Sequence, residues 1–303
     1  MKSIEIAGQT FLIKDYYCAQ DGDEYLAKTD GKLWLYVNLT DLCPCSCPFC
    51  VNPCNKSGEN PSNLSCFQNA LDRVRDYICG VSFTGGEPML HPQLLDKVIE
   101  VTHDTLGPEV EIDMVTSGLD IEKVLSLKSN HYLYSIHISR HRTDDGQNRQ
   151  LMGVRTPSSK NLEAILKEMQ DPGKVVFNCI LHKDGIHSVD GMAEYLEMAA
   201  QTGVRNTSFI SLIPANDYCI EQFVHPDSLH LEKDERFRIW NRFHDHDFCS
   251  CSSGDYKAAS GWVRFYYRAP GRAAVPYARQ LVYTADNRLL AGFGGPSIDL
   301  NPA

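Results

Sequence analysis

The feature that most constrains the fold is a regular alternation of apolar and amphipathic segments between residues 33 and 213. Six runs have strand length: Leu33–Leu39, Val81–Thr84, Glu111–Thr116, Leu133–Ser139, Val175–Leu181 and Asn206–Ile213. The first of them is apolar on both faces. Between them, helical patterns cover residues 91–107, 120–127, 158–170 and 189–202. Strands buried on both faces and joined by helices indicate a parallel α/β sheet.

A closed barrel needs eight strand–helix units, and here the alternation stops near residue 215. The sequence therefore predicts a partial (β/α)6 TIM-type barrel over residues 31–215, with its active residues at the carboxyl ends of the strands.

Two regions flank this barrel. Residues 1–30 alternate weakly around Gly8 and predict an N-terminal hairpin. Residues 216–303 predict a C-terminal α+β cap, with a charged helix within 227–247 followed by antiparallel strands in WVRFYYR and RQLVYTADNRLLAGF. Residues 285–288 supply the expected hairpin turn between the last strands.

Charge and hydropathy exclude several classes of partner. The net charge of -10 argues against a general nucleic-acid surface, which needs clustered Lys and Arg. No apolar run approaches the roughly 20 residues that span a bilayer, so no membrane partner is expected. The first residues have mixed charges and no apolar signal core, so we expect a cytoplasmic protein.

Cysteine usage points to a metal site. The chain has 12 cysteines, and six of them fall between Cys43 and Cys66. In a reducing compartment, clustered cysteines are more often metal ligands or catalysts than disulfides. Cys43-x3-Cys47-x2-Cys50 directly follows the first barrel strand, which puts it on the predicted catalytic rim. Three thiolates can hold three irons of a [4Fe–4S] cluster and leave the fourth iron open for chemistry.

The cysteines alone leave other interpretations open. A zinc site is one, and Cys45, Cys54 or Cys66 could help to close it. Ordinary thiols without a ligand role are another. A metal-stabilised binding protein without catalysis is thus an alternative to an enzyme.

The surrounding motifs favour the iron–sulfur interpretation. Phe49 precedes the third cysteine, and Gly85-Gly86-Glu87-Pro88 follows the second strand. Together with the cysteines, these motifs resemble the signatures of the radical S-adenosylmethionine (SAM) superfamily, with a core closest to its MoaA/PqqE-like class. The resemblance covers about residues 30–215. It implies that Cys43, Cys47 and Cys50 ligate the cluster, without Cys45.

The resemblance also implies a SAM site around the rim. Residues 85–88 correspond to the family's amino-group site, where Glu87 would stand opposite the ammonium of SAM. Thr116-Ser117-Gly118 resembles the family's Thr-Asn-Gly turn, with Ser in place of Asn. Ser139-Arg140-His141 falls where the family contacts the ribose and carboxylate of SAM, and an Arg suits a carboxylate.

The implied activity is that of an oxidoreductase or lyase that starts with reductive cleavage of SAM. One electron, from a donor such as flavodoxin or ferredoxin, yields methionine and a 5′-deoxyadenosyl radical, which abstracts hydrogen from a small-molecule or peptide substrate. An activase that makes a glycyl radical in a partner enzyme is the alternative within the family. The long C-terminal region favours a capped site and a smaller substrate.

The C-terminal region raises two further expectations. Its last strands resemble the hairpin of the GTP cyclase cap, but Ala291-Gly292 stands where a cluster cysteine is expected, so we expect one cluster per chain, without Cys249 and Cys251. Strand alternation in WVRFYYR places Arg264, Tyr266 and Arg268 on one side. With Arg279 they predict a cationic face for an anionic group of the substrate.

Overall fold

A computed structural model describes residues 2–13, 33–52, 62–242, 252–268, 277–278, 280–292 and 295–301. Within these ranges, none of the helices combines the length and the apolar character needed to cross a bilayer.

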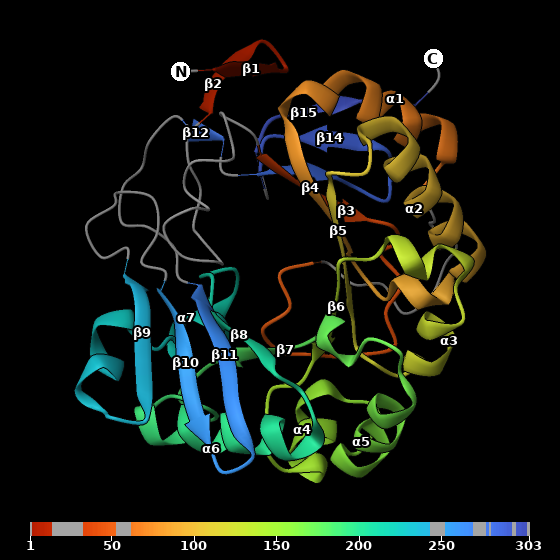
Figure 1. Ribbon diagram of the computed structural model, residues 1–303. Coiled ribbons are helices and arrows are strands. Elements are labelled where there is room, and N and C mark those ends of the chain that lie inside the picture. Colours follow the sequence, from red (N-terminus) through yellow and green to blue (C-terminus); the bar gives the residue numbers. More distant parts are fainter. Residues whose placement is uncertain are drawn as a thin grey trace.

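One curved sheet organises the molecule (Figure 1). Its 12 strands are, in spatial order, β15 (Ser297–Asp299), β14 (Arg288–Leu290), β13 (Leu281–Tyr283), β3 (Leu33–Asn38), β4 (Ile78–Thr84), β5 (Glu111–Thr116), β6 (Ser135–Ser139), β7 (Val175–Leu181), β8 (Asn206–Ser211), β11 (Gly261–Arg268), β10 (Ser252–Ala258) and β9 (Phe237–Arg242). Strands β3 to β8 are parallel to one another, β13 adds to β3 in parallel, and β11 adds to β8 in parallel. The described strands form no closed barrel, because β15 and β9 are edges.

Among the described residues, five helices cover the outer side of the curve: α1 (Leu64–Val74), α2 (Pro92–Leu106), α3 (Ile121–Leu125), α5 (Ser159–Glu168) and α6 (Val189–Thr202). The chain also forms α4 (Asp145–Met152) and the short α7 (Asp217–Glu221), which contact the loop after β3. Figure 1 shows α1 to α3 along one flank of the sheet and α5 and α6 along another. Their ends follow capping rules: the side chain of Ser158 accepts from the backbone of Asn161 at the start of α5, and Gly203 ends α6 with φ 96°.

The two faces of each strand differ in chemistry. The outer face carries fully buried apolar side chains such as Leu35, Phe83 and Phe177, which pack under the helices. The inner face carries buried polar side chains, among them Asp113, His137, Asn178 and Ser208, which strand register places on adjacent strands. The hydrophobic core is therefore on the helix side, and the inner side is available for chemistry.

The predicted α/β partial barrel is confirmed, and its six core strands lie where the apolar runs put them. The N-terminal hairpin also forms from β1 (Ser3–Ile6) and β2 (Gln9–Ile13), and β12 (Tyr277–Ala278) pairs with β2. The turn between β13 and β14 has Asn287 at φ 63°, as a tight hairpin requires.

The C-terminal region differs from expectation in two respects. The charged helix within 227–247 is wrong: the described part contains two 3-10 turns, Pro226–Ser228 and Leu231–Lys233, and then β9. Strand β11 is antiparallel to β10, as expected, but it also extends the barrel sheet in parallel beside β8. The boundary at residue 215 therefore does not separate two sheets. Antiparallel pairing of β9 with β10 overrides the local helical pattern.

Candidate functional site

The cysteine loop, residues 39–52, follows β3 at the carboxyl edge of the sheet. Cys43, Cys47 and Cys50 are partly exposed, whereas Cys45 is buried. The Cys45 thiol lies within hydrogen-bond contact of both Cys43 and Cys47, and these contacts, with burial, raise its pKa. The loop therefore brings Cys45 into contact with two of the three motif cysteines.

The Gly-Gly-Glu segment docks directly on this loop. The backbone N–H of Gly86 donates to the carbonyl of Thr40 at 2.7 Å, and that of Glu87 donates to the carbonyl of Leu42 at 2.8 Å. A Cβ at position 86 would lie 1.9 Å from the carbonyl oxygen of Leu42. Gly85 has φ 111°, and a Cβ added to it would lie 2.8 Å from the Cα of Asn38. Both glycines are therefore required for this close approach. The two sequence motifs form one structural unit.

Two helices complete the support of the loop. The N–H of Ser46 donates to the carbonyl of Met152 at the end of α4, at 2.8 Å. The amide of Asn216, the cap of α7, donates to the carbonyl of Pro48 at 3.1 Å, and the thiol of Cys219 contacts the carbonyl of Phe49 at 3.7 Å. Sequence reasoning missed these supports, because they join segments more than 100 residues apart without a shared motif.

Glu87 is enclosed by the neighbouring strand end. Its carboxylate accepts from the hydroxyl of Thr116 at 2.7 Å, from the N–H and hydroxyl of Ser117, and from the N–H of Met89. Burial raises the pKa of this carboxyl, although the hydrogen bonds oppose the shift. The structure thus joins two predicted SAM-site segments, residues 85–88 and 116–118, through this side chain. Its contact with the ammonium of SAM stays a prediction.

Arg140 is directed into the protein instead of toward the rim. Its side chain is 1% exposed, and its guanidinium donates to Asp145, Ser159 and the carbonyls of Arg142, Thr143 and Pro157. These partners occupy the donors that a SAM carboxylate would need. The geometry favours a role in which Arg140 positions the loop after β6, where Ser139 ends the strand. A contact of Arg140 with SAM, as predicted, would require the guanidinium to give up some of these hydrogen bonds and form new ones with SAM.

An aromatic group surrounds Phe49 beside the cysteine loop. The ring of His141 meets Phe49 edge to face at 4.8 Å, and the ring of His182 lies 6.3 Å away. Burial lowers the pKa of His141 to about 3 and that of His182 to about 4, so both rings are neutral near pH 7. The hydroxyl of Tyr218 and Nδ1 of His182 are 3.1 Å apart. Phe49 is therefore held by neutral rings from two strand ends.

The inner wall of the sheet holds a buried polar chain that sequence reasoning did not single out. Ser135 donates to Asp113 at 2.6 Å, Nε2 of His137 lies 3.7 Å from Asp113, and Nδ1 of His137 bonds Asn178 at 2.9 Å. Burial raises the pKa of Asp113 to about 6 and lowers that of His137 to about 4. This polar chain could have been predicted from the sequence, because polar residues occur at alternate positions of otherwise apolar strands.

The alternation of side chains that was predicted for β11 is observed. Val263, Phe265 and Tyr267 are buried on one side of the strand, and Arg264 and Tyr266 line a cavity on the other. Arg268 acts electrostatically on Asp113 and His137. Its role toward a substrate stays a prediction. The expectations for Arg279, Cys249 and Cys251 lie outside the described residues.

The donor chemistry of the cysteine loop fits an iron–sulfur cluster, because thiolates are the usual ligands of such clusters. Among the described residues, however, no group of three or more His, Cys, Asp or Glu side chains is placed to hold a metal ion. The assignment of Cys43, Cys47 and Cys50 as ligands therefore remains a prediction from the motif.

The family assignment follows from this combination of fold and motifs. The model of the Radical SAM superfamily matches residues 37–225, well over half of the chain. The chain belongs to the radical SAM superfamily, whose enzymes use a [4Fe–4S] cluster and SAM.

Solved structures of this fold are similar to the chain at low sequence identity. Streptococcus suis SuiB bound to the precursor peptide SuiA is 16% identical, with a TM-score of 0.54, over 86% of this chain and 59% of that one. SuiB bound to S-adenosylmethionine is 19% identical, with a TM-score of 0.49, over 64% and 44%. A third structure, anSMEcpe with bound AdoMet, is 13% identical, with a TM-score of 0.48, over 65% and 57%. The chain thus spans about half the length of these proteins.

Proposed function

We propose that this protein is a radical SAM enzyme that cleaves SAM reductively and uses the resulting 5′-deoxyadenosyl radical to abstract hydrogen from a substrate. The observation that carries the proposal is the docking of Gly86 and Glu87 on the cysteine loop, with backbone hydrogen bonds of 2.7 and 2.8 Å. An ordinary turn does not require two glycines in such close contact with the backbone of a neighbouring loop.

Each rim segment has a role in this proposal. Cys43, Cys47 and Cys50 hold the cluster, which supplies the electron for SAM cleavage when it is bound. The carbonyls of residues 85 and 86 and the Glu87 carboxylate face the amino group of SAM. Thr116, Ser117 and Ser139 border its ribose and carboxylate, and Phe49 with its neutral histidine neighbours excludes water from the adenosine side.

The substrate is a small molecule or a peptide. The shared fold with SuiB, whose structure holds a precursor peptide, supports a peptide as one of these two classes. An inner wall lined by Asp113, His137 and Asn178 suits a polar substrate group. The electron donor is a small redox protein such as flavodoxin or ferredoxin, and the site of action is the cytoplasm.

Anaerobic reconstitution tests the proposal. The reconstituted protein is reduced with dithionite in the presence of SAM, and 5′-deoxyadenosine and methionine are quantified by mass spectrometry. Formation of both in equal amounts is the expected result. A colourless protein that binds zinc, and forms neither product after reconstitution with iron and sulfide, would identify a metal-stabilised binding protein instead.

A further inference from the structure

One peptide unit of the Gly-Gly-Glu segment is held at both ends by the cysteine loop. Its N–H, from Gly86, donates to the carbonyl of Thr40 at 2.7 Å. Its carbonyl, from Gly85, accepts from Nδ2 of Asn52 at 3.1 Å. Both groups belong to one planar unit, so the two hydrogen bonds together fix its orientation. Asn52 lies two residues after Cys50, and the loop that carries the motif cysteines therefore also orients a backbone carbonyl after β4.

The orientation of the Asn52 amide follows from its two partners. A backbone carbonyl only accepts hydrogen bonds, so Asn52 must present its NH2 group to Gly85. Its Oδ1 then accepts from Nδ2 of Asn38 at 3.3 Å. Asn38 ends β3, and its side chain is buried. The hydrogen bonds therefore run in one direction, from Asn38 through Asn52 to the carbonyl of Gly85.

Glycine makes this support necessary. Gly85 has φ 111°, and two consecutive glycines restrict the rotation of their shared peptide less than other residues do. A side chain cannot replace the first glycine, because a Cβ there would lie 2.8 Å from the Cα of Asn38. The segment therefore cannot stiffen itself, and hydrogen bonds from the cysteine loop supply the rigidity.

The orientation of Asn38 has a cost. Its Oδ1 is buried and forms no hydrogen bond with the residues that the structure describes. Turning the amide over would not remove this cost, because the oxygen would then face Oδ1 of Asn52. A buried acceptor without a partner calls for an explanation. The fixed direction of the Gly85 carbonyl supplies one.

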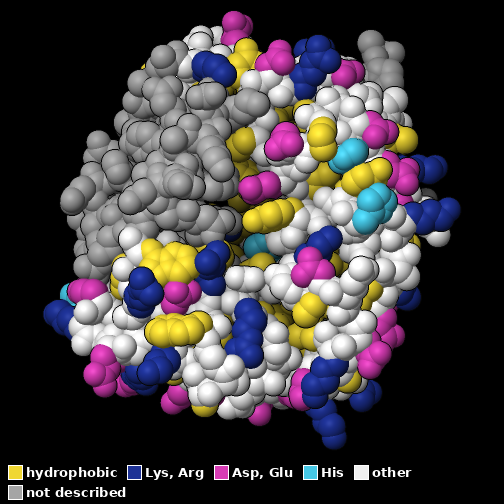
Figure 2. Space-filling view, in the orientation of Figure 1, with side chains coloured by type: hydrophobic (Ala, Val, Ile, Leu, Met, Phe, Trp, Pro, Cys, Tyr) yellow, Lys and Arg dark blue, Asp and Glu magenta, His cyan; other side chains and the backbone are white. Residues whose placement is uncertain are grey.

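SAM gives this fixed carbonyl a purpose. The methionine part of SAM carries an amino group and a carboxylate close together, so charges of either sign attract one of them and repel the other. On the face of the molecule that Figure 2 shows, Lys and Arg side chains are interspersed with Asp and Glu side chains. Exposed charges are also screened over about 10 Å. Short hydrogen bonds must therefore place the amino group.

We propose that Asn52 is a positioning residue for SAM, because it fixes the Gly85 carbonyl as an acceptor for the amino group of SAM. A carbonyl oxygen has two lone pairs. One accepts from Asn52, and the second accepts from an N–H of SAM. Asn38 keeps the Asn52 amide in the required orientation. The inference rests on the proposed function, in which the carbonyls of residues 85 and 86 face this amino group.

Calorimetry of SAM binding to the reconstituted protein tests the proposal. Asn52→Ala removes the donor, and Asn52→Leu removes it at nearly constant size. We expect both variants to bind SAM about tenfold more weakly, as the loss of one hydrogen bond implies, and to keep the iron content of the parent protein. A second ligand, 5′-methylthioadenosine, lacks the amino and carboxylate groups of SAM. Its affinity should not change.

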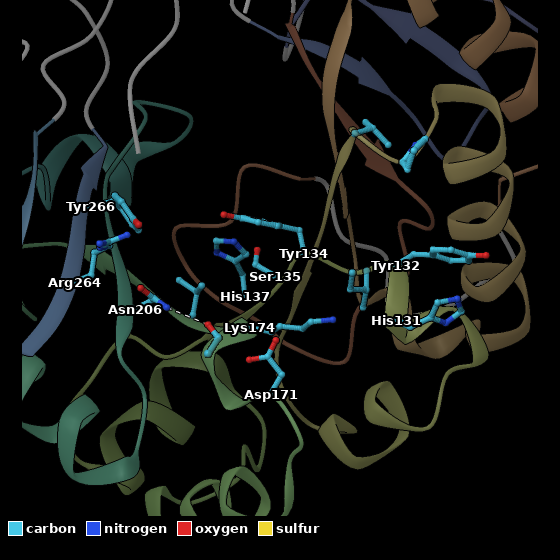
Figure 3. Close-up of a pocket in the computed structure, with 15 residues that line it drawn as sticks. His131, Tyr132, Tyr134, Ser135, His137, Asp171, Lys174, Asn206, Arg264 and Tyr266 are labelled. Atoms are coloured by element: carbon cyan, nitrogen blue, oxygen red, sulfur yellow. Dashed lines mark hydrogen bonds between the residues drawn. The ribbon is translucent and has the colours of Figure 1, made fainter. Parts of the chain in front are cut away.

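Asn206→Ala is the matched control. Asn206 begins β8, at the end of the sheet opposite to the cysteine loop. Its Nδ2 donates to the carbonyl of Gly173 at 3.0 Å, which is drawn as a dashed line in Figure 3. The control therefore loses the same kind of hydrogen bond, from an Asn amide to a glycine carbonyl, away from the SAM site. Its affinities for both ligands should equal those of the parent protein.

The outcomes separate positioning from general support of the loop. Unchanged SAM affinity in Asn52→Ala and Asn52→Leu would refute the inference. A loss that extends equally to 5′-methylthioadenosine, or that comes with loss of iron, would also refute it, because Asn52 would then only support the loop. Formation of 5′-deoxyadenosine by the parent protein is measured in parallel. Its absence would refute the proposed function, whereas cleavage with unchanged affinity in both variants would refute only this inference.

Discussion

The cysteine loop contains four cysteines between residues 43 and 50, but only three cluster ligands are predicted. Each cysteine must therefore be tested separately as a ligand. Cys45 is buried between Cys43 and Cys47, whereas the three motif cysteines are more exposed. We expect Ala at position 43, 47 or 50 to abolish iron retention and formation of 5′-deoxyadenosine, and Cys45→Ala to keep both. Iron analysis and product quantification on anaerobic protein check this. Activity in Cys47→Ala with loss in Cys45→Ala would assign the ligands differently.

Glu87 links the ends of β4 and β5, and its removal should weaken SAM binding. Glu87→Ala leaves the donors of Thr116 and Ser117 without their acceptor, a loss of about 1–3 kcal/mol for each buried group. We expect at least tenfold weaker SAM binding by calorimetry, with a lower Tm. Glu163→Ala, which breaks an exposed pair with Lys167 on α5, is the control and should change neither. SAM affinity equal to that of the parent would disprove the role.

The buried pair Asp113–His137 gives stability a defined pH dependence. His137 has a folded pKa of about 4, below its ordinary value of 6.5, so its unfolded state takes up the proton first and stability falls as pH drops from 6.5 to 4. Asp113 has a folded pKa of about 6, above its ordinary value of 3.8, so it gains stability as pH drops from 6 to 3.8. The two effects oppose each other over most of this range.

Substitution of the histidine separates these contributions. Relative to the parent, His137→Gln should gain up to about 3 kcal/mol in free energy of unfolding between pH 6.5 and pH 4, because only the parent carries the histidine penalty. Denaturant unfolding of both proteins at several pH values measures this difference. The contributions of His141 and His182 cancel, because both proteins contain them. A difference that stays constant with pH would contradict the assigned direction for His137.

At the scale of elements, the docking of the β4 exit on the cysteine loop depends on glycine. A Cβ at position 86 would lie 1.9 Å from a backbone oxygen that cannot rotate away. We expect Gly86→Ala to cost about 3 kcal/mol or more in free energy of unfolding and to lower iron retention. Gly146→Ala is the control, because its Cβ would meet only the flexible side chain of Asp144 at 3.2 Å. Two variants of equal stability would show that the contact is not required.

At the scale of the whole molecule, the C-terminal strands continue the barrel sheet on both edges. β13 to β15 extend it beside β3, and β9 to β11 extend it beside β8. The partial barrel thereby gains two further parallel strands, so the inner wall becomes longer than the six predicted units provide. This extension brings Arg264 within reach of a cavity that β6 and β7 also line.

Cluster content is a property of the whole chain. Because Ala291-Gly292 stands where a cap cysteine is expected, we predict one cluster, which means about four irons per fully reconstituted chain. Iron and sulfide analysis of the anaerobic protein measures this. A value near eight that drops in Cys249→Ala would establish a second cluster.

The sequence alone determined the core strands, most of their helices and the family, because these depend on local patterns. The periodicity of hydrophobic residues over about ten positions predicts a strand or a helix. The signature motifs are short segments that directly follow these strands. Helix α5 with its cap Ser158 and the loop of Cys43, Cys47 and Cys50 are examples. The role of the glycines at positions 85 and 86 could be predicted for the same reason.

Only the tertiary structure decided what depends on distant segments. The parallel pairing of β11 with β8 and the approach of Asn216 to Pro48 join segments far apart in sequence. The strand β9 in place of a helix depends on its pairing with β10, and the inward direction of Arg140 depends on how the chain folds around it. An open sheet edge satisfies its backbone hydrogen bonds with whichever strand the fold brings to it, and a buried guanidinium turns toward the acceptors that surround it. Neither choice follows from hydrophobic periodicity or from a motif.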